Sequence, residues 1–283
     1  MRKLSFILSI LMLFCLCSCG KNDTTDGTKI TVAVTIGPEA EFVSKICKQN
    51  AEIITMLPAG ASPETYEITP KEAIKLQEAD IYFAIGVAME QNSVLNALPD
   101  NLPVIELHKS VSSVYPDLLE GEHRDPHIWL SVKRVKVIVE KITAEIILLD
   151  PDNAQFYKQN SQEYLSELNE LENEIENLFA NKKERKFIVF HPAFSYFAND
   201  FSLFPFALEQ HGKEITPKHL GNMVDFARNN KIKTIFYQAD ASARQPLAFA
   251  KEIGGEAVML NPLADNYTKN MKEMAKAIAK AMK

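Results

Sequence analysis

Hydrophobic segments of two different periods alternate along this chain. Short runs rich in β-branched residues, at 30–36, 53–57, 80–86 and 103–107, are typical of buried strands. Between them, apolar residues recur every three or four positions, as they do on amphipathic helices. The same alternation resumes after residue 186. Strands that alternate with helices predict βαβ units and therefore mainly parallel sheets.

Local signals mark where several of these helices begin and end. Thr69-Pro70 and Thr216-Pro217 each supply an N-cap hydroxyl followed by proline in the first helical position. Gly254-Gly255 is a typical helix stop. The remaining predicted elements are helices over 37–50, 131–149, 217–230, 243–253 and 271–282, and strands over 187–190, 234–237 and 257–260.

One predicted helix, over residues 153–180, is unusually long for a globular protein and lies at the centre of the chain. Its apolar positions include Leu165, Leu168, Leu171, Ile175 and Leu178. A coiled-coil dimer is disfavoured because the pattern lasts too few heptads, and we expect a monomer. The sequence therefore predicts an α/β fold of two lobes with mainly parallel sheets, joined by one long connecting helix. Ligands of such sheets bind beyond the carboxyl ends of the strands, so we expect the functional site in the cleft between the lobes.

The first residues predict export and lipid attachment. Arg2 and Lys3 precede an apolar run that is short for a membrane span. The run ends in Leu16-Cys17-Ser18-Cys19-Gly20, which resembles a bacterial lipobox with cleavage before Cys19. An ordinary secretory peptide is the alternative. The predicted division of the chain is a signal peptide (1–18), a flexible tether (19–29), an N-terminal lobe (30–149), a linking helix (150–182) and a C-terminal lobe (183–283).

Composition narrows the function classes. The 46% hydrophobic content is typical of a globular protein. Without Arg2 and Lys3, 29 basic residues face 37 acidic ones, which argues against nucleic acid as a partner. Membrane contact should come from the lipid on Cys19. Only Cys47 would remain as a free thiol, so no disulfide framework is expected, and its apolar surroundings favour a packing role.

Three short motifs carry the candidate chemistry. They are Pro63-Glu64-Thr65-Tyr66-Glu67-Ile68-Thr69-Pro70, Asp125-Pro126-His127-Ile128-Trp129-Leu130 and Phe190-His191-Pro192-Ala193-Phe194. Each follows a predicted strand or loop, from which a side chain can point into a shared cleft. One carboxylate (Glu64) and two imidazoles (His127 and His191) make most of a coordination shell for a divalent metal such as zinc. Trp129, the one tryptophan, should pack behind His127.

With these motifs, and with Asn261-Pro262-Leu263 near the end, the chain resembles the metal-binding lipoproteins that serve zinc/manganese-type ABC importers (cluster A-I). The resemblance covers essentially the whole mature chain. It implies two α/β lobes joined by a long helix, with the metal between them and His127 and His191 as ligands. It further implies an extracytoplasmic, lipid-anchored protein that delivers metal to a membrane permease.

Two positions depart from the family pattern. The family usually has histidine where this chain has Glu64, and an acidic residue where it has Asn261. Glu64 can substitute as a harder ligand, whereas a surface carboxylate is the alternative. Asn261 is a weaker, neutral donor, which leaves the fourth ligand open. The candidates are water, Asn261, Gln238, Glu209, His211 and Glu214.

Capture and delivery of a divalent metal is therefore the predicted function. Two imidazoles favour Zn²⁺, and Mn²⁺ or Fe²⁺ stays open because Glu64 adds oxygen character. A lipid-anchored zinc hydrolase is an alternative, since two histidines and a glutamate also form hydrolytic zinc sites. However, the chain has no His-Glu-x-x-His or Gly-x-Ser-x-Gly motif. A binder of a metal chelate is the second alternative.

Overall fold

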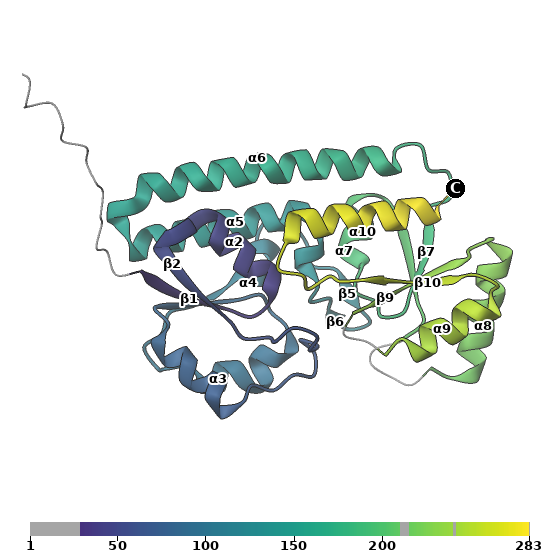
Figure 1. The fold of residues 1–283 in the computed structure, drawn as a ribbon, viewed down its shortest axis with the longest axis horizontal. Helices are drawn as coiled ribbons and strands as arrows, with labels where there is room; N and C mark the ends of the chain where they lie inside the picture. The colour runs from purple at the N-terminus through teal and green to yellow at the C-terminus, as the bar shows by residue number, and fades with distance from the viewer. Residues whose placement is uncertain (1–28, 210–214, 240–241, 283) are drawn as a thin grey trace, which may run out of the picture.

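The computed structural model describes residues 29–209, 215–239 and 242–282 (Figure 1). The expected lipid site Cys19 and the fourth-ligand candidates His211 and Glu214 lie outside the described residues. No helix in the described ranges is long and apolar enough to cross a membrane.

The N-terminal sheet has four parallel strands in the order β2-β1-β3-β4. They are β1 (Ile30–Val34), β2 (Ala51–Thr55), β3 (Ile81–Ala84) and β4 (Val104–Glu106). Helices α2 (Gly37–Cys47), α3 (Pro70–Lys75) and α4 (Leu107–Ser112) accompany them, with a π-helical segment at Glu90–Val94. The chain then forms a short hairpin of β5 (Leu119–Glu120) and β6 (His123–Arg124).

The C-terminal sheet repeats this plan in the order β10-β9-β7-β8, again all parallel. Its strands are β7 (Lys186–Val189), β8 (Phe204–Ala207), β9 (Thr234–Gln238) and β10 (Glu256–Leu260). Its helices are α7 (Ser195–Asp200), α8 (Pro217–Asn229) and α9 (Arg244–Glu252). The predicted α/β class with two parallel sheets is therefore confirmed.

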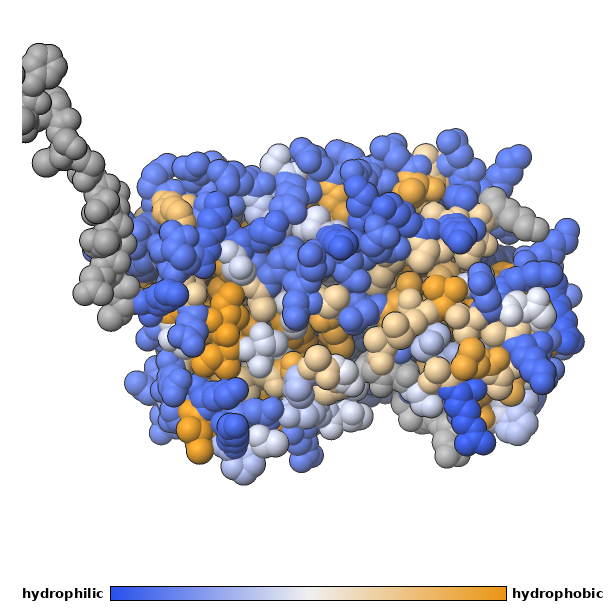
Figure 2. Space-filling model, viewed as in Figure 1, coloured by the Kyte–Doolittle hydropathy of each residue, from blue (hydrophilic) through white to orange (hydrophobic). Residues whose placement is uncertain are grey.

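Three long helices cover both sheets on one side (Figure 1). They are α5 (Val132–Leu149), α6 (Ala154–Phe179) and α10 (Tyr267–Ala281). Helix α6 packs against α2 and α5 from the N-terminal half and against α10 from the C-terminal end. Its outer face is hydrophilic (Figure 2). The long connecting helix is thus confirmed, although it begins at Ala154 because Pro151–Asn153 forms a 3₁₀ turn.

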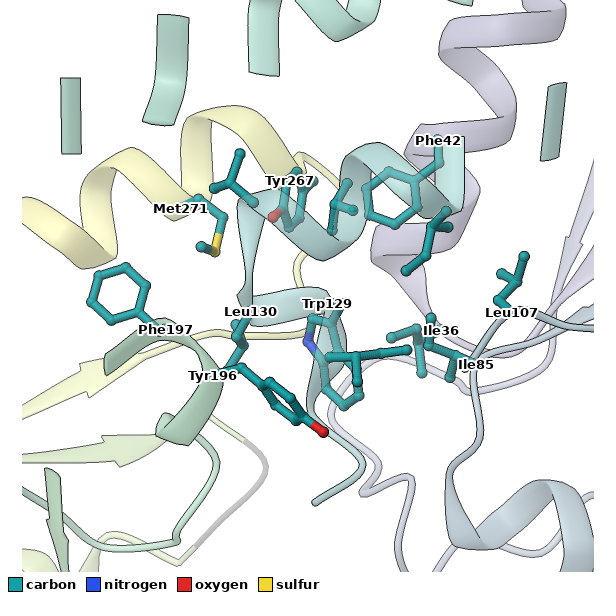
Figure 3. Close-up of a cluster of buried hydrophobic side chains, with 14 of the residues drawn as sticks. Ile36, Phe42, Ile85, Leu107, Trp129, Leu130, Tyr196, Phe197, Tyr267 and Met271 are labelled. Atoms are coloured by element: carbon teal, nitrogen blue, oxygen red, sulfur yellow. The ribbon is translucent and has the colours of Figure 1, made fainter. Parts of the chain in front are cut away.

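The hydrophobic core is continuous between the two sheets. One cluster of buried side chains runs from β1 through Trp129 to the last helix, and a smaller one lies beneath α8 and α9. Figure 3 shows Trp129 between Ile36 and Ile85 on one side and Tyr196 on the other. Phe42 of α2 meets Tyr267 of α10 edge to face, with ring centroids 5.0 Å apart. Shared packing of this kind holds the two halves in a fixed relation. The residue boundaries predicted for the lobes stay a prediction.

Cap residues account for the element starts that the sequence predicts. The Thr69 hydroxyl accepts from the Glu72 N–H while the Glu72 carboxylate accepts from the Thr69 N–H, a complete capping box. The Thr216 hydroxyl caps α8 through the His219 N–H at 3.2 Å. Cys47 is fully buried, as expected of a packing residue.

Candidate metal centre

The three candidate ligands reach one place from loops that follow strands or precede helices. Glu64 lies in the loop after β2, and His127 immediately precedes the 3₁₀ turn Ile128–Leu130 that leads into α5. His191 follows β7 by two residues. Glu64 thus comes from the carboxyl end of a strand in the N-terminal sheet and His191 from that of a strand in the C-terminal sheet, while His127 follows the β5–β6 hairpin, so the site lies where the two halves meet.

The geometry of this triad is compact. Glu64 Oε1 lies 3.0 Å from His191 Nε2 and 3.9 Å from His127 Nε2. The two imidazole rings are 5.3 Å apart and nearly perpendicular, at 71°. Among the described residues, this is the one group of three His, Cys, Asp or Glu side chains whose donor atoms lie within 4.8 Å of one another. Both Nε2 atoms therefore face the same carboxylate oxygen.

Each histidine forms a hydrogen bond through Nδ1 with a second carboxylate. Asp125 Oδ1 lies 2.8 Å from His127 Nδ1 and also accepts from the His127 backbone N–H. Glu209 Oε2 lies 2.9 Å from His191 Nδ1. A carboxylate on Nδ1 keeps a proton on that nitrogen, so Nε2 is the nitrogen that can bind a metal, and it makes the imidazole a stronger donor. Both rings are thus oriented and tautomerically suited for ligation.

Electrostatics show how tightly these groups are coupled. Burial alone would lower the pKa of His191, but hydrogen bonds and charge from Glu209 and Glu64 outweigh it and raise the pKa to about 10. The hydrogen bond from His191 lowers the pKa of Glu64 against the opposing effect of burial, and the charges of both histidines add to it. At neutral pH, without metal, His191 is a cation between two carboxylates.

The triad borders a small cavity of about 230 Å³. The His127 and His191 side chains are 4% and 12% exposed, whereas Glu64 is 36% exposed and lies toward solvent. The remaining lining residues are Ser62, Pro63, Thr65, Trp129, Phe190, Glu209, Gln238, Pro262 and Leu263. Trp129 packs beside His127, with ring centroids 5.2 Å apart, and its Nε1 donates to the Pro262 carbonyl at 3.0 Å. A cavity of this size suits a bare ion with water better than a large chelate.

The described candidates for the fourth ligand occupy different places. Gln238 lines the cavity and is 93% buried. Asn261 instead lines a larger neighbouring groove, and its Oδ1 accepts from the Leu263 N–H at 3.2 Å. The Glu209 carboxylate is turned to the Nδ1 side of His191. Sequence reasoning missed the role of Asp125, although its position two residues before His127 is a usable signal.

Comparisons with known proteins cover nearly the whole chain. The model of the family described as "Zinc-uptake complex component A periplasmic" (ZnuA) matches residues 32–281. The chain is 29% identical to the high-affinity zinc uptake system protein ZnuA of Bacillus subtilis, over 93% of this chain and 89% of that protein. It is 26% identical to the zinc-binding lipoprotein AdcA of Streptococcus pneumoniae, of which it spans 60%. It is 28% identical to the manganese ABC transporter substrate-binding lipoprotein PsaA of Streptococcus mitis, over 86% and 84% of the two chains.

Solved structures of zinc-binding proteins have the same fold as this chain. A crystal structure of ZnuA superposes with a TM-score of 0.85 at 34% identity, covering 89% of this chain and 99% of that one. The periplasmic zinc-binding protein TroA of Treponema pallidum shares the fold, with a TM-score of 0.82 at 20% identity. Sequence and fold therefore lead to one conclusion: the chain belongs to the ZnuA family of periplasmic zinc-uptake components, which are solute-binding parts of transporters and not enzymes.

Proposed function

We propose that this protein captures a single divalent metal ion, zinc in the first place, and delivers it to the membrane permease of an ABC importer. The observation that carries the proposal is the convergence of Glu64 Oε1 with the Nε2 atoms of His127 and His191. Family membership supports transport and removes the hydrolase alternative. The relatives named for zinc, and the two imidazoles, favour zinc over manganese.

Gln238 is the fourth donor that the geometry supports best. Gln238 lines the same cavity as the triad and is largely buried there, whereas Asn261 lines the neighbouring groove and its Oδ1 accepts from the Leu263 N–H. A neutral amide leaves only Glu64 as a charged ligand. Asp125 and Glu209 lie directly behind the two imidazoles and offset the remaining positive charge.

Lipid attachment would keep the protein close to the permease. The relatives AdcA and PsaA are named as lipoproteins, and the lipobox-like sequence supports lipid attachment at Cys19. The protein is accordingly extracytoplasmic and lipid-anchored. Incorporation of labelled fatty acid into the wild type, and its loss in Cys19→Ala, is the expected result. Equal labelling of both proteins would show that Cys19 does not carry the lipid.

Competition with a chromophoric zinc chelator tests capture of the bare ion. Wild-type protein should withdraw zinc from the chelator, and His127→Ala should lose most of this ability because one of three strong donors is gone. His123→Ala is the matched control, since His123 is exposed and only four residues away. Capture that appears only when zinc is offered as a chelate would replace the bare-ion proposal by chelate binding.

A further inference from the structure

Two carboxylates outside the metal centre are buried at the carboxyl ends of β1 and β3. Glu39, in the first turn of α2, is 0% exposed, and Glu90, at the start of the π-helical segment, is 2% exposed. Strands β1 and β3 are neighbours, and from β1 the sheet extends to β2 on one side and to β3 on the other. This point, where open α/β sheets commonly bind a ligand, is occupied here by the two acids.

Glu90 is bound from several directions. Its Oε1 accepts from the Ile85 N–H at 2.8 Å and from the Thr35 hydroxyl at 2.5 Å, and its Oε2 accepts from the Gly86 N–H at 2.8 Å. The Thr35 hydroxyl also lies 2.6 Å from Tyr82 Oη. Glu39 Oε2 accepts from the backbone N–H groups of residues 35 and 36.

Burying these acids is costly. Within the described part of the chain, neither carboxylate has a Lys, Arg or His ion-pair partner, and Glu39 Oε1 has no hydrogen-bond partner. Burial raises the pKa of Glu90 to about 7 against its hydrogen bonds. Burial also raises the pKa of Glu39 well above its ordinary value, and the nearby Glu90 adds to that shift. An apolar pair would avoid this cost, which points to a positional role for the hydrogen bonds.

The turn that Glu90 holds touches both ligand-bearing segments of the N-terminal half. The Met89 N–H donates to the Pro63 carbonyl at 2.9 Å, directly before Glu64. The Gly86 carbonyl accepts from the Arg124 guanidinium, which also donates to the Asp125 carbonyl at 3.4 Å. Gly86 itself has φ +97°, and an added Cβ would overlap the Arg124 and His108 side chains. Turn 85–89 is therefore a close-fitting brace between the Glu64 loop and the loop that carries Asp125 and His127.

We propose that Glu90 is a positioning residue of the metal centre: by fixing turn 85–89 it holds the segments of Glu64 and His127 at the spacing that one ion requires. Glu90 does not touch the ion and acts through Met89 and Gly86. His191, on the other half of the molecule, does not depend on this brace.

Hydrogen–deuterium exchange on the metal-free protein tests the brace without relying on the proposed function. Glu90→Ala should speed exchange at least several-fold in peptides covering 62–68 and 124–130, while peptides over 187–193 stay as in the wild type. Glu90→Gln keeps one acceptor oxygen and should give an intermediate effect. Of the two contacts that turn 85–89 makes with these segments, Arg124→Ala removes only the one between the Gly86 carbonyl and the Arg124 guanidinium. It should therefore speed exchange in the 124–130 peptide and leave the 62–68 peptide unchanged. Thr143→Val is the matched control, because it removes a buried hydroxyl whose hydrogen bonds within the described residues go only to Val139 of α5 and Ser161 of α6.

Metal affinity is the second readout, and this part rests on the proposed function. Glu90→Ala and Glu90→Gln should weaken zinc binding several-fold, less than the about 10- to 100-fold typical of groups that contact a metal ligand directly, whereas Thr143→Val should not. Two results would contradict the positioning role of Glu90. One is an equal rise in exchange rate in all peptides; the other is a wild-type exchange rate at 62–68 and 124–130 in both Glu90 variants. If wild-type protein binds no zinc, the proposed function fails, but the exchange result still decides the role of Glu90.

Discussion

At the scale of single residues, the site is defined by pairs rather than by isolated ligands. His127 is paired with Asp125, and His191 with Glu209, through the nitrogen that faces away from Glu64. Glu64 then supplies the shared oxygen at 3.0 Å and 3.9 Å from the Nε2 atoms of His191 and His127. This arrangement leaves a compact set of one oxygen and two nitrogens, with ring orientations fixed before any ion arrives.

Glu209→Gln tests the partner of His191. A glutamine side chain can still hydrogen-bond to Nδ1, but it lacks the negative charge that strengthens the imidazole as a donor. We expect zinc affinity to fall about 10- to 100-fold, as measured by chelator competition, with little loss of thermal stability because Glu209 is only partly buried. A complete loss of binding would instead assign Glu209 as a direct ligand, and unchanged affinity would contradict the orienting role.

Proton release on metal binding follows from the raised pKa of His191. Below about pH 10 the metal-free imidazole is protonated, and an ion can bind Nε2 only after that nitrogen loses its proton. Metal binding at pH 7 should therefore release about one proton from His191, and affinity should rise as the pH rises. Titration calorimetry in two buffers of different ionisation enthalpy measures this number. A value near zero would mean that His191 is neutral in the metal-free protein or is not a ligand.

At the scale of elements, the pattern of the sequence predicted most of the longer helices and strands, but not the short helices α4 and α7, and it placed the start of α10 four residues late. The apolar spacing around Leu168, Leu171 and Ile175 predicted α6 to within a residue or two, because these side chains are buried along one helical face. Cap hydroxyls at Thr69 and Thr216 were equally informative. Strand β8 was missed because Pro205 interrupts its pattern. A proline is tolerated there because β8 is an edge strand.

Contacts between elements that are distant in sequence could not be predicted from the spacing of apolar residues or from cap residues. Glu90 lies 55 residues from Thr35, and the burial of its carboxylate depends on β1 and β3 lying side by side. The orienting role of Glu209 likewise depends on the loop after β8 returning beside β7. The motifs around His127 and His191 were recognisable because their residues are adjacent in sequence, whereas these supporting partners are not.

The pH dependence of stability tests the buried state of Glu90. Its folded pKa of about 7 is raised above the ordinary value of 4.5. The protonated acid therefore contributes stability that is fully present below about pH 4.5 and is lost as the pH rises through about 7. Relative to Glu90→Gln, the metal-free wild type should lose about 2 kcal/mol of unfolding free energy between pH 5 and 8. Urea unfolding at several pH values measures this difference; a constant difference would show that Glu90 titrates normally.

At the scale of the whole molecule, the two halves behave as one packed body. Helix α6 contacts elements of both, and the core is continuous through Trp129 and Tyr267. Polar contacts add to it: the Glu41 carboxylate of α2 accepts from the Tyr267 N–H at 2.6 Å and from the Thr268 N–H at 3.3 Å, at the start of α10. Wide hinge closure around the ion would have to break this packing.

Small-angle scattering tests this rigidity. Because the shared core and α6 resist rotation of one half against the other, metal-free and zinc-loaded protein should have the same radius of gyration within error. Structural change should be confined to the loops around Glu64 and the ends of β7 and β9. A clear compaction on loading would show that the halves close as hinged domains.

Glu64, His127 and His191 should together hold one transported ion. Metal content and competition, measured on wild-type protein and on the variant with alanine at all three positions, test it most directly. Wild-type protein should keep about one zinc per chain through dialysis and lose little of it to manganese, and the variant should hold no metal. No stoichiometric metal in the wild type, or equal metal in both proteins, would contradict it.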